Sequence, residues 1–329
     1  MNRELDKWLK PQIRFLIDCR PHSPAMGNAI KHLRQLVLQT PPDMTLADAK
    51  RQLCAALDEY VANRVVGATS VLVGHGLSRI DDGDVVLTFG RSNAVERLLL
   101  SARAAGRRFR AVVVSARPRN EGRALLRALV RGGVPCTFVL LSGLSWAMQE
   151  VTKVFLGAAA VMSNGAVFSR AGTSLVAMAA KRYRAPVLFC AETYKFCERV
   201  QLDSICYNEL GDPDRLVDTQ PGGGYEYNQE GTAWGGGGVG AALKTGYCGG
   251  YGDPRCGYPR RHPYQGPGAG GAIAEPLEGW REQENLLLLN LEYDLTPSEF
   301  VDGVVTELGL VPPTSVPVII REREKAGVQ

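Results

Sequence analysis

Short polar runs that follow apolar, strand-like segments are the parts of this sequence best suited to chemistry. The run Gly90-Arg91-Ser92-Asn93 comes directly after the apolar run VVLTF. Further along, Asn164 precedes Arg170 and Thr173, which open a predicted helix. Glycine, hydroxyl and arginine groups, together with the free amides of a helix N-terminus, can hold an anion. The sequence therefore predicts an anion site made of Gly90, Arg91, Ser92, Asn164, Arg170 and Thr173.

Two further loops follow predicted strands, at Glu192–Phe196 and Tyr293–Thr296. Glu192 and Lys195 are three residues apart, so we expect a local ion pair on a solvated turn. Each loop alone is weak evidence, since a threonine at a helix start is most often only a cap. The sequence has no G-x-G-x-x-G run, Walker A lysine, G-x-S-x-G elbow or H-E-x-x-H motif. Spacing alone leaves an enzyme and a binding subunit equally open.

Composition narrows the classes of protein and of site. The eight cysteines include no C-x-x-C pair and the four histidines are scattered, so we expect no structural metal and no cofactor. A net charge of +4 argues against DNA binding. No run of about 18 apolar residues occurs, so no membrane span is predicted. Cysteines within apolar runs and a charged N-terminus favour a reducing, cytoplasmic location.

The elements that would position these loops fall into two groups. Apolar residues recur at helical spacing through residues 1–80, and Thr45 with Asp48 predicts a capping box. Beyond them, predicted helices at 93–105, 120–132, 145–155 and 172–183 separate five short apolar, strand-like runs. These runs are DVVLTFG, RAVVVSA, PCTFVLL, AAAVMSN and APVLFCAE. We therefore predict an α/β fold: a helical domain at 1–80, then a Rossmann-like, doubly wound parallel sheet at 81–329.

The end of the chain resumes this pattern after an interruption. Residues 221–271 hold 18 of the 37 glycines, so we predict a flexible Gly/Tyr-rich insertion at about 215–280. A surface insertion without a role and a segment that binds RNA or a partner both remain open. Beyond it we expect a strand within 286–297, a helix at Ser298–Leu308 and a last strand at 316–320.

Several segments together resemble one family. They include DGDVVLTFGRSNAVERLL, GAAAVMSNGAVFSRAGT and NLEYDLTPSEFVDGVVTELGL. These resemble the alpha, beta and delta subunits of initiation factor 2B, and CRPHSPAMGNAIK with ETYKFCERVQLD resembles the delta branch. Delta subunits also carry a long extension ahead of the segment at which this chain begins, and the insertion here is larger than the family pattern implies.

The resemblance implies a regulatory, non-catalytic role in the guanine nucleotide exchange complex for initiation factor 2. It implies partners in the beta, alpha, gamma and epsilon subunits. It also implies contact with the alpha subunit of initiation factor 2, phosphorylated or not. For that contact we expect Arg3, Asn63, Arg64 and Gly67. For pairing with the beta subunit we expect Tyr194, Phe196, Leu289, Tyr293 and Asp294.

The same loops resemble those of sugar-phosphate isomerases of the methylthioribose-1-phosphate and ribose-1,5-bisphosphate types, or of a ligand-sensing relative. Those enzymes use a cysteine in the loop after the first sheet strand and an aspartate in a G-[AV]-D motif. Here the loop reads Gly90-Arg91-Ser92 and the motif reads Gly157-Ala158-Ala159. Moving a proton between sugar carbons needs a positioned acid and base, which alanine does not supply. The sequence therefore argues against isomerase activity, and the isomerase is kept as the alternative function.

Overall fold

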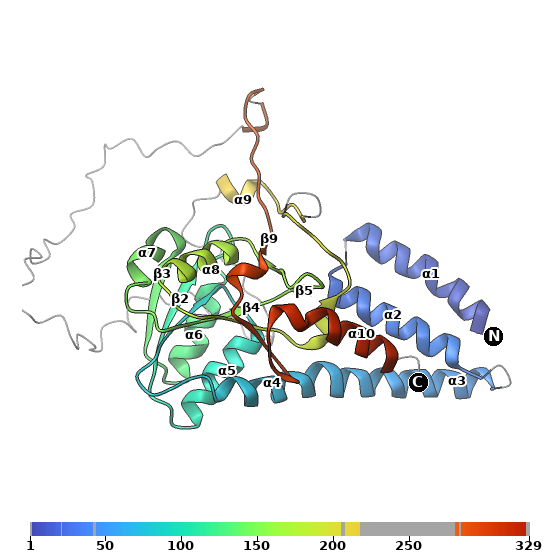
Figure 1. Ribbon diagram of the computed structural model, residues 1–329. Helices are drawn as coiled ribbons and strands as arrows, with labels where there is room; N and C mark the ends of the chain where they lie inside the picture. Colours follow the sequence, from blue (N-terminus) through green and yellow to red (C-terminus); the bar gives the residue numbers. More distant parts are fainter. Residues whose placement is uncertain are drawn as a thin grey trace, which may run out of the picture. The chain divides into compact units, whose positions relative to one another are not determined.

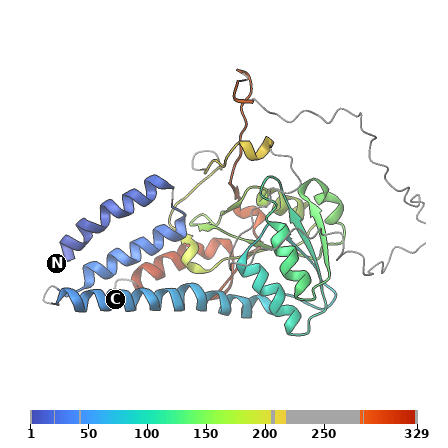
Figure 2. The same cartoon turned by 180° about the vertical axis from the view of Figure 1, so that it is seen from behind.

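The first eighty residues form a succession of helices, as the apolar spacing of the sequence predicts. The computed structural model describes residues 2–20, 22–41, 44–204, 208–217, 280–282 and 284–326. Its first helices are α1 (Asn2–Cys19), α2 (Pro24–Gln39), α3 (Leu46–Tyr60), the π-helix η1 (Val61–Gly67) and α4 (Ala68–Leu77). The last three follow one another without a break and make one long helix, seen from opposite sides in Figure 1 and Figure 2.

Polar side chains at the helix starts explain where α2 and α3 begin. The Ser23 hydroxyl accepts a hydrogen bond from the Met26 amide, and Pro24 occupies the first turn of α2. The Thr45 hydroxyl likewise accepts from the Asp48 amide at the start of α3, which confirms the cap predicted there. Both caps satisfy amides that the helix itself leaves without an acceptor.

A seven-stranded sheet follows, with the strand order β11-β10-β7-β4-β1-β2-β3. Its strands are β1 (Val85–Phe89), β2 (Arg110–Ser115), β3 (Cys136–Leu140), β4 (Lys153–Gly157), β7 (Val187–Cys190), β10 (Gly303–Thr306) and β11 (Gly309–Val311). All neighbours run parallel except β10 and β11, which are antiparallel. The predicted, mostly parallel sheet is thus present.

Helices cover both faces of this sheet, as a doubly wound fold requires. They are α5 (Asn93–Ala104), α6 (Gly122–Arg131), α7 (Leu144–Ala147), α8 (Thr173–Arg182) and α10 (Val316–Ala326). Apolar side chains from α4, α5 and α6 pack with Val86 and Phe155 on one face. Those from α7, α8 and α10 pack with Leu87 and Leu156 on the other face. The sheet is therefore buried between two apolar cores, which is why its strands are almost wholly apolar.

A second, four-stranded sheet lies beyond the carboxyl end of β4 and has the order β8-β5-β6-β9. It consists of β5 (Ala160–Met162), β6 (Val167–Arg170), β8 (Phe196–Cys197) and β9 (Tyr293–Thr296). The run AAAVMSN, predicted to lie in the parallel sheet, supplies β5 of this smaller sheet instead. The strand predicted within 286–297 is present only as β9.

Three predicted elements differ from the structure. Residues 153–155 end the helix predicted at 145–155 but begin β4, because β1 and β7 flank this segment on both sides. The predicted helix at 298–308 contains only the short 3₁₀ turn η5 (Ser298–Phe300), followed by β10. The predicted strand at 316–320 is the start of α10, where Val316 and Ile320 bury the same helical face. Short apolar runs do not by themselves distinguish a strand from a helix.

The remaining described elements are short. They are the 3₁₀ turns η2 (Leu141–Gly143), η3 (Thr193–Lys195), η4 (Trp280–Glu282) and η6 (Pro313–Ser315), and the one-turn helix α9 (Asp214–Val217). No helix in the described ranges is long and apolar enough to cross a membrane.

The N-terminal helices and the two sheets belong to one compact unit. The described residues of 1–216 and 288–329 form this unit, which does not include residues 217–287. Whether residues 1–80 also fold as a domain of their own stays a prediction. The Gly/Tyr-rich segment at about 215–280 lies almost wholly outside the described residues.

Candidate functional site

A pocket of about 230 Å³ lies where β1 and β4 end, at the carboxyl edge of the main sheet. This is the edge at which open parallel sheets bind ligands. Its lining residues are Phe89, Arg91, Ser92, Asn93, Gly157, Ala158, Ala159, Ser169, Arg170, Thr173 and Lys195. The loops after β1 and β4, strand β6, the start of α8 and the turn η3 therefore meet here.

Most of the predicted anion residues come together in this pocket. Arg91, Ser92, Arg170 and Thr173 line it, and Gly90 turns the chain into it with a φ of 65°. Asn164 does not join them. Its side chain lies in the turn between β5 and β6, where it donates to the Gln201 carbonyl and accepts from the Ala166 amide. Asn164 therefore shapes the small sheet instead.

Small residues are required where β4 enters the pocket. A Cβ atom added to Gly157 would lie 2.3 Å from the Ser92 Cβ, so only glycine allows the two loops to approach. Ala158 and Ala159 follow at the pocket wall. Within the described part of the chain, the lining contains no cysteine, histidine, aspartate or glutamate. The pocket accordingly lacks an acid and base pair for proton transfer.

Each cationic side chain of the pocket already faces a carboxylate of this chain. Arg91 contacts Glu96 at 2.9 Å. Arg170 contacts Glu292 at 3.0 Å, and Lys195 contacts Glu192 at 2.7 Å. An incoming anion would have to compete with these internal partners. The pocket is thus positively lined but internally neutralised.

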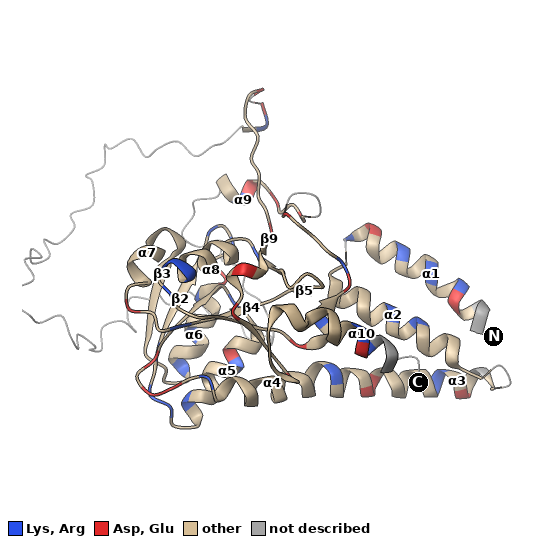
Figure 3. Cartoon of the chain, viewed as in Figure 1, with Lys and Arg blue, Asp and Glu red and all other residues tan. Residues whose placement is uncertain are grey.

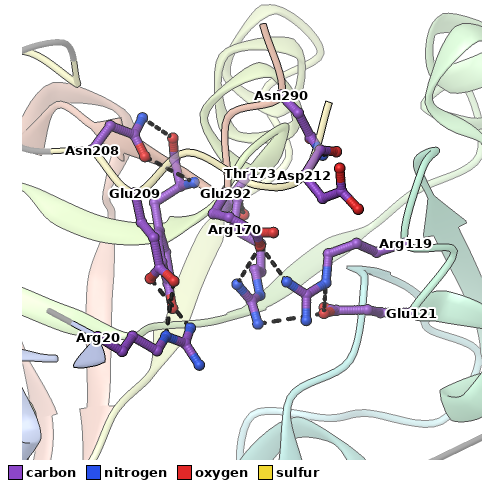
Figure 4. A network of polar contacts seen from close by, with 11 residues as sticks. Arg20, Arg119, Glu121, Arg170, Thr173, Asn208, Glu209, Asp212, Asn290 and Glu292 are labelled. Atoms are coloured by element: carbon purple, nitrogen blue, oxygen red, sulfur yellow. Dashed lines mark hydrogen bonds and ion pairs between the residues drawn. The ribbon is translucent and has the colours of Figure 1, made fainter. Parts of the chain in front are cut away.

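Beside the pocket, two arginines and two glutamates form the centre of the larger network drawn in Figure 4. Glu292 is 7% exposed and accepts hydrogen bonds from both Arg119 and Arg170. Glu121 contacts Arg119 at 2.8 Å and Arg170 at 3.4 Å. Burial disfavours the charge of Arg119, but the two glutamates outweigh it and raise the pKa of the guanidinium. The network ties β6 to the segment before β9.

The same segment is paired with residues far from it in sequence. The Glu292 amide donates to the Glu209 carbonyl, and the Gly211 amide donates to the Asn290 carbonyl. Leu210 and Leu291 form an antiparallel bridge between these contacts. Residues 208–212 and 290–293 therefore run side by side. We call these two segments, together with the preceding Leu289, the neck. The Arg20 guanidinium at the end of α1 also contacts Glu209 of the neck, at 2.8 Å.

Asp294 and Tyr293, which the sequence analysis places at a subunit interface, support the pocket from within the chain. The Asp294 carboxylate accepts from the amides of Gly172 and Ser174, so it caps α8. Burial raises the pKa of Asp294 to about 6. The Tyr293 ring stacks on Phe168 at 4.7 Å, and the Arg170 guanidinium lies 4.9 Å from the centre of that ring.

The other predicted interface residues fall into two environments. Phe196 is 2% exposed and belongs to the core beneath the main sheet. Tyr194 is half-buried, and burial raises the pKa of its hydroxyl. Leu289, in contrast, is 57% exposed. The surface of this chain therefore offers Leu289, and not Phe196, to a partner.

The predicted partner-contact residues of the helical region gather on the π-helix η1. Asn63 and Arg64 are exposed there, and Gly67 ends the turn. A π-turn within a long helix is rare and often marks a functional site. Residue spacing alone does not predict this π-turn. Arg3 lies in α1, but its side chain is outside the described residues.

Comparison with known proteins places the chain in a family. Residues 1–313 match the family model described as the Initiation factor 2 subunit family. The chain belongs to this family. The family predicted from the sequence motifs is therefore confirmed, and so is the α/β fold with its N-terminal helices.

Several members of the family are similar over nearly the whole chain. Translation initiation factor eIF2B subunit delta of Dictyostelium discoideum is 41% identical over 98% of this chain and 44% of its own length. The delta subunit of Schizosaccharomyces pombe is 38% identical over 98% of this chain and 59% of its own length. The chain thus spans about half the length of these relatives. Ribose 1,5-bisphosphate isomerase of Pyrococcus furiosus is 26% identical over 98% of this chain and 82% of its own length.

A solved structure of eIF2B subunits is also similar to this chain. The crystal structure of the tetrameric eIF2B-beta2-delta2 complex from C. thermophilum matches with a TM-score of 0.66 and 28% sequence identity. The match covers 91% of this chain and 74% of the matched chain.

Proposed function

We propose that this chain is a regulatory, non-catalytic subunit, of the delta type, in an initiation factor 2B guanine nucleotide exchange complex. The observation that carries the proposal is the chemical make-up of the pocket at the sheet edge. Ala158 and Ala159 form its wall, its lining supplies no acid and base pair, and each of its cations faces a carboxylate of the chain. Similarity to two delta subunits over 98% of the chain supports the same assignment.

Pairing with a beta subunit is part of this proposal, and the neck is the surface we assign to it. Leu210 and Leu291 are 66% and 39% exposed on the two paired segments, and the preceding Leu289 is 57% exposed. Exposed apolar residues gathered in one place are typical of protein interfaces. The similar structure is itself a beta2-delta2 complex. We further propose the alpha, gamma and epsilon subunits as partners in the same assembly, in the cytoplasm.

Contact with the alpha subunit of initiation factor 2 is the regulatory part of the proposal, and we assign it to η1. A phosphoserine adds close to two negative charges and three acceptor oxygens, which exposed arginines attract. Basic residues of the neighbouring helices are less suited, because Lys10 and Arg34 both pair with Asp6 and Arg14 pairs with Asp18. Figure 3 shows acidic and basic residues interspersed along α1.

Arg64→Glu tests this assignment in the assembled exchange complex. Exchange on the unphosphorylated partner should stay near the wild-type rate. Inhibition by the phosphorylated partner should weaken about tenfold, which corresponds to about 1.4 kcal/mol of binding. Lys50→Glu makes the same charge change on exposed α3 and should leave inhibition unchanged. Equal inhibition of the wild type and Arg64→Glu would show that η1 is not the sensor.

The runner-up is a sugar-phosphate isomerase, which the similarity to ribose 1,5-bisphosphate isomerase favours. Since the pocket lining lacks an acid and base pair, we expect the purified chain not to isomerise ribose 1,5-bisphosphate or methylthioribose 1-phosphate. The measurement is turnover at saturating substrate. A rate above about 0.1 per second, within two decades of the median enzyme, would establish the isomerase and refute a non-catalytic role.

A further inference from the structure

Glu192 is a buried carboxylate that lies between the pocket and the long helix. Glu192 is only 3% exposed, although its place in the sequence predicts a solvated ion pair on a turn. One carboxylate oxygen lies 2.7 Å from the Lys195 ammonium. The other accepts a hydrogen bond of 2.7 Å from the Thr69 hydroxyl. The carboxylate end of the ion pair is therefore buried, and it contacts a helix more than a hundred residues away in sequence.

The ionised form of Glu192 is the one that the structure stabilises. Burial by itself would raise the pKa of this carboxyl, but the charge of Lys195 and the hydrogen bonds from Lys195 and Thr69 outweigh it and lower the pKa. A buried carboxylate that keeps its charge needs all of these partners in place. The positions of Lys195 and Thr69 are therefore coupled through Glu192.

Thr69 lies in the first turn of α4, directly after η1, and is 4% exposed. Its hydroxyl lies 3.0 Å from the Val65 carbonyl of η1 and 2.7 Å from the Glu192 carboxylate. A hydroxyl has one hydrogen to donate, and a charged acceptor at shorter distance receives it preferentially. Glu192 thus binds the residue that would otherwise hydrogen-bond back into the π-turn.

The π-turn needs such an external contact because its own hydrogen bonds are irregular. The Ala68 amide donates to the Asn63 carbonyl, five residues back, and also to the Val65 carbonyl. Thr69 lies at the end of this turn, which exposes Asn63 and Arg64. Its hydrogen bond to Glu192 therefore fixes the end of the turn from outside the helix.

We propose that Glu192 is a positioning residue: it holds the π-turn η1 through Thr69 and links that turn to the pocket through Lys195. The regulatory meaning of this link rests on the function proposed above for η1. The hydrogen-bond chain itself, from Lys195 to Glu192 to Thr69, does not depend on that function. It joins the carboxyl edge of the sheet to the helical region.

Hydrogen exchange of the full chain, measured by mass spectrometry, tests the link with Thr69→Val and Thr69→Ser. Valine keeps the shape but removes the hydroxyl, whereas serine keeps the hydroxyl. In Thr69→Val we expect the amides of residues 62–68 to exchange at least tenfold faster, while those of β1 and β2 keep wild-type rates. In Thr69→Ser the same amides should exchange within about twofold of their wild-type rates.

Lys195→Met tests the other half of the link, since it leaves Glu192 without its counter-charge. The same amides should again exchange at least tenfold faster, without a change in β1 and β2. Unchanged exchange at 62–68 in Thr69→Val or Lys195→Met would overturn the proposal. A uniform increase across η1, β1 and β2 would also overturn it, because it would show general destabilisation only.

A second measurement separates this inference from the proposed function. Guanine nucleotide exchange complexes that contain Thr69→Val or Thr69→Ser are assembled. Their nucleotide exchange rates are then measured with and without the phosphorylated alpha subunit of initiation factor 2. Loss of inhibition in the valine variant alone supports both the link and the sensor. Faster amide exchange at 62–68 with wild-type inhibition supports the link and refutes η1 as the sensor.

Discussion

Phe196→Asp is expected to unfold the chain, and not merely to release a partner. The ring is 2% exposed and packs within the core that contains Val161, Val187 and Val304. Truncating a buried phenylalanine costs about 3–5 kcal/mol, and burying a carboxylate adds several more. The sum approaches the whole stability of an ordinary domain. Urea unfolding followed by far-ultraviolet circular dichroism measures it.

Two variants give this prediction its controls. Phe196→Leu keeps an apolar side chain of similar size and should cost about 1 kcal/mol. Leu289→Asp changes an exposed residue of the neck, so its unfolding curve should match the wild type. Its binding to the beta subunit should instead weaken by at least 30-fold, or about 2 kcal/mol, as for an interface hot spot. A folded Phe196→Asp that fails to bind the beta subunit would place Phe196 at the interface after all.

Glu292→Ala is expected to lower the free energy of unfolding by about 3 kcal/mol, because it leaves two guanidinium groups without their buried counter-charge. Arg119 and Arg170 would then share only Glu121. Both arginines are about 30% exposed, so water compensates part of the loss. Urea denaturation at neutral pH is the measurement.

Matched variants separate the charge from the shape of Glu292. Glu292→Gln keeps an acceptor oxygen and should fall between the wild type and the alanine variant. Glu299→Ala removes an exposed carboxylate nearby in the chain and should change stability by no more than about 0.5 kcal/mol. If Glu292→Ala and Glu299→Ala unfold at the same urea concentration, the network of Figure 4 contributes little to stability.

The sequence was sufficient for the features that depend on local pattern. The helices of residues 1–80 follow from apolar spacing, and the cap of α3 follows from Thr45. The strands β1, β2, β3 and β7 follow from apolar runs bounded by polar residues. Four pocket residues were also predicted from the loops after these strands, since the carboxyl ends of parallel strands meet at one edge.

Sequence pattern alone did not predict whether a segment forms a strand or a helix where that depends on the segments packed beside it. Residues 153–157 and 316–320 are both short apolar runs, yet one is a central strand and the other begins a helix. A strand is defined by the chains that pair with it, and those lie far away in sequence. The separate four-stranded sheet escaped prediction for the same reason, since β6 and β9 are more than a hundred residues apart.

What the sequence by itself determined is the family, the alternation of helices and strands, and the absence of the isomerase cysteine and aspartate from their loops. Only the tertiary structure decided what those residues do. It buried Phe196, turned the expected surface pair of Glu192 and Lys195 into a buried link to Thr69, and matched the cations of the pocket with carboxylates. The physical reason is that charge pairing and burial act between atoms brought together by folding, and their energies depend on distance and solvent exposure, which sequence spacing does not specify.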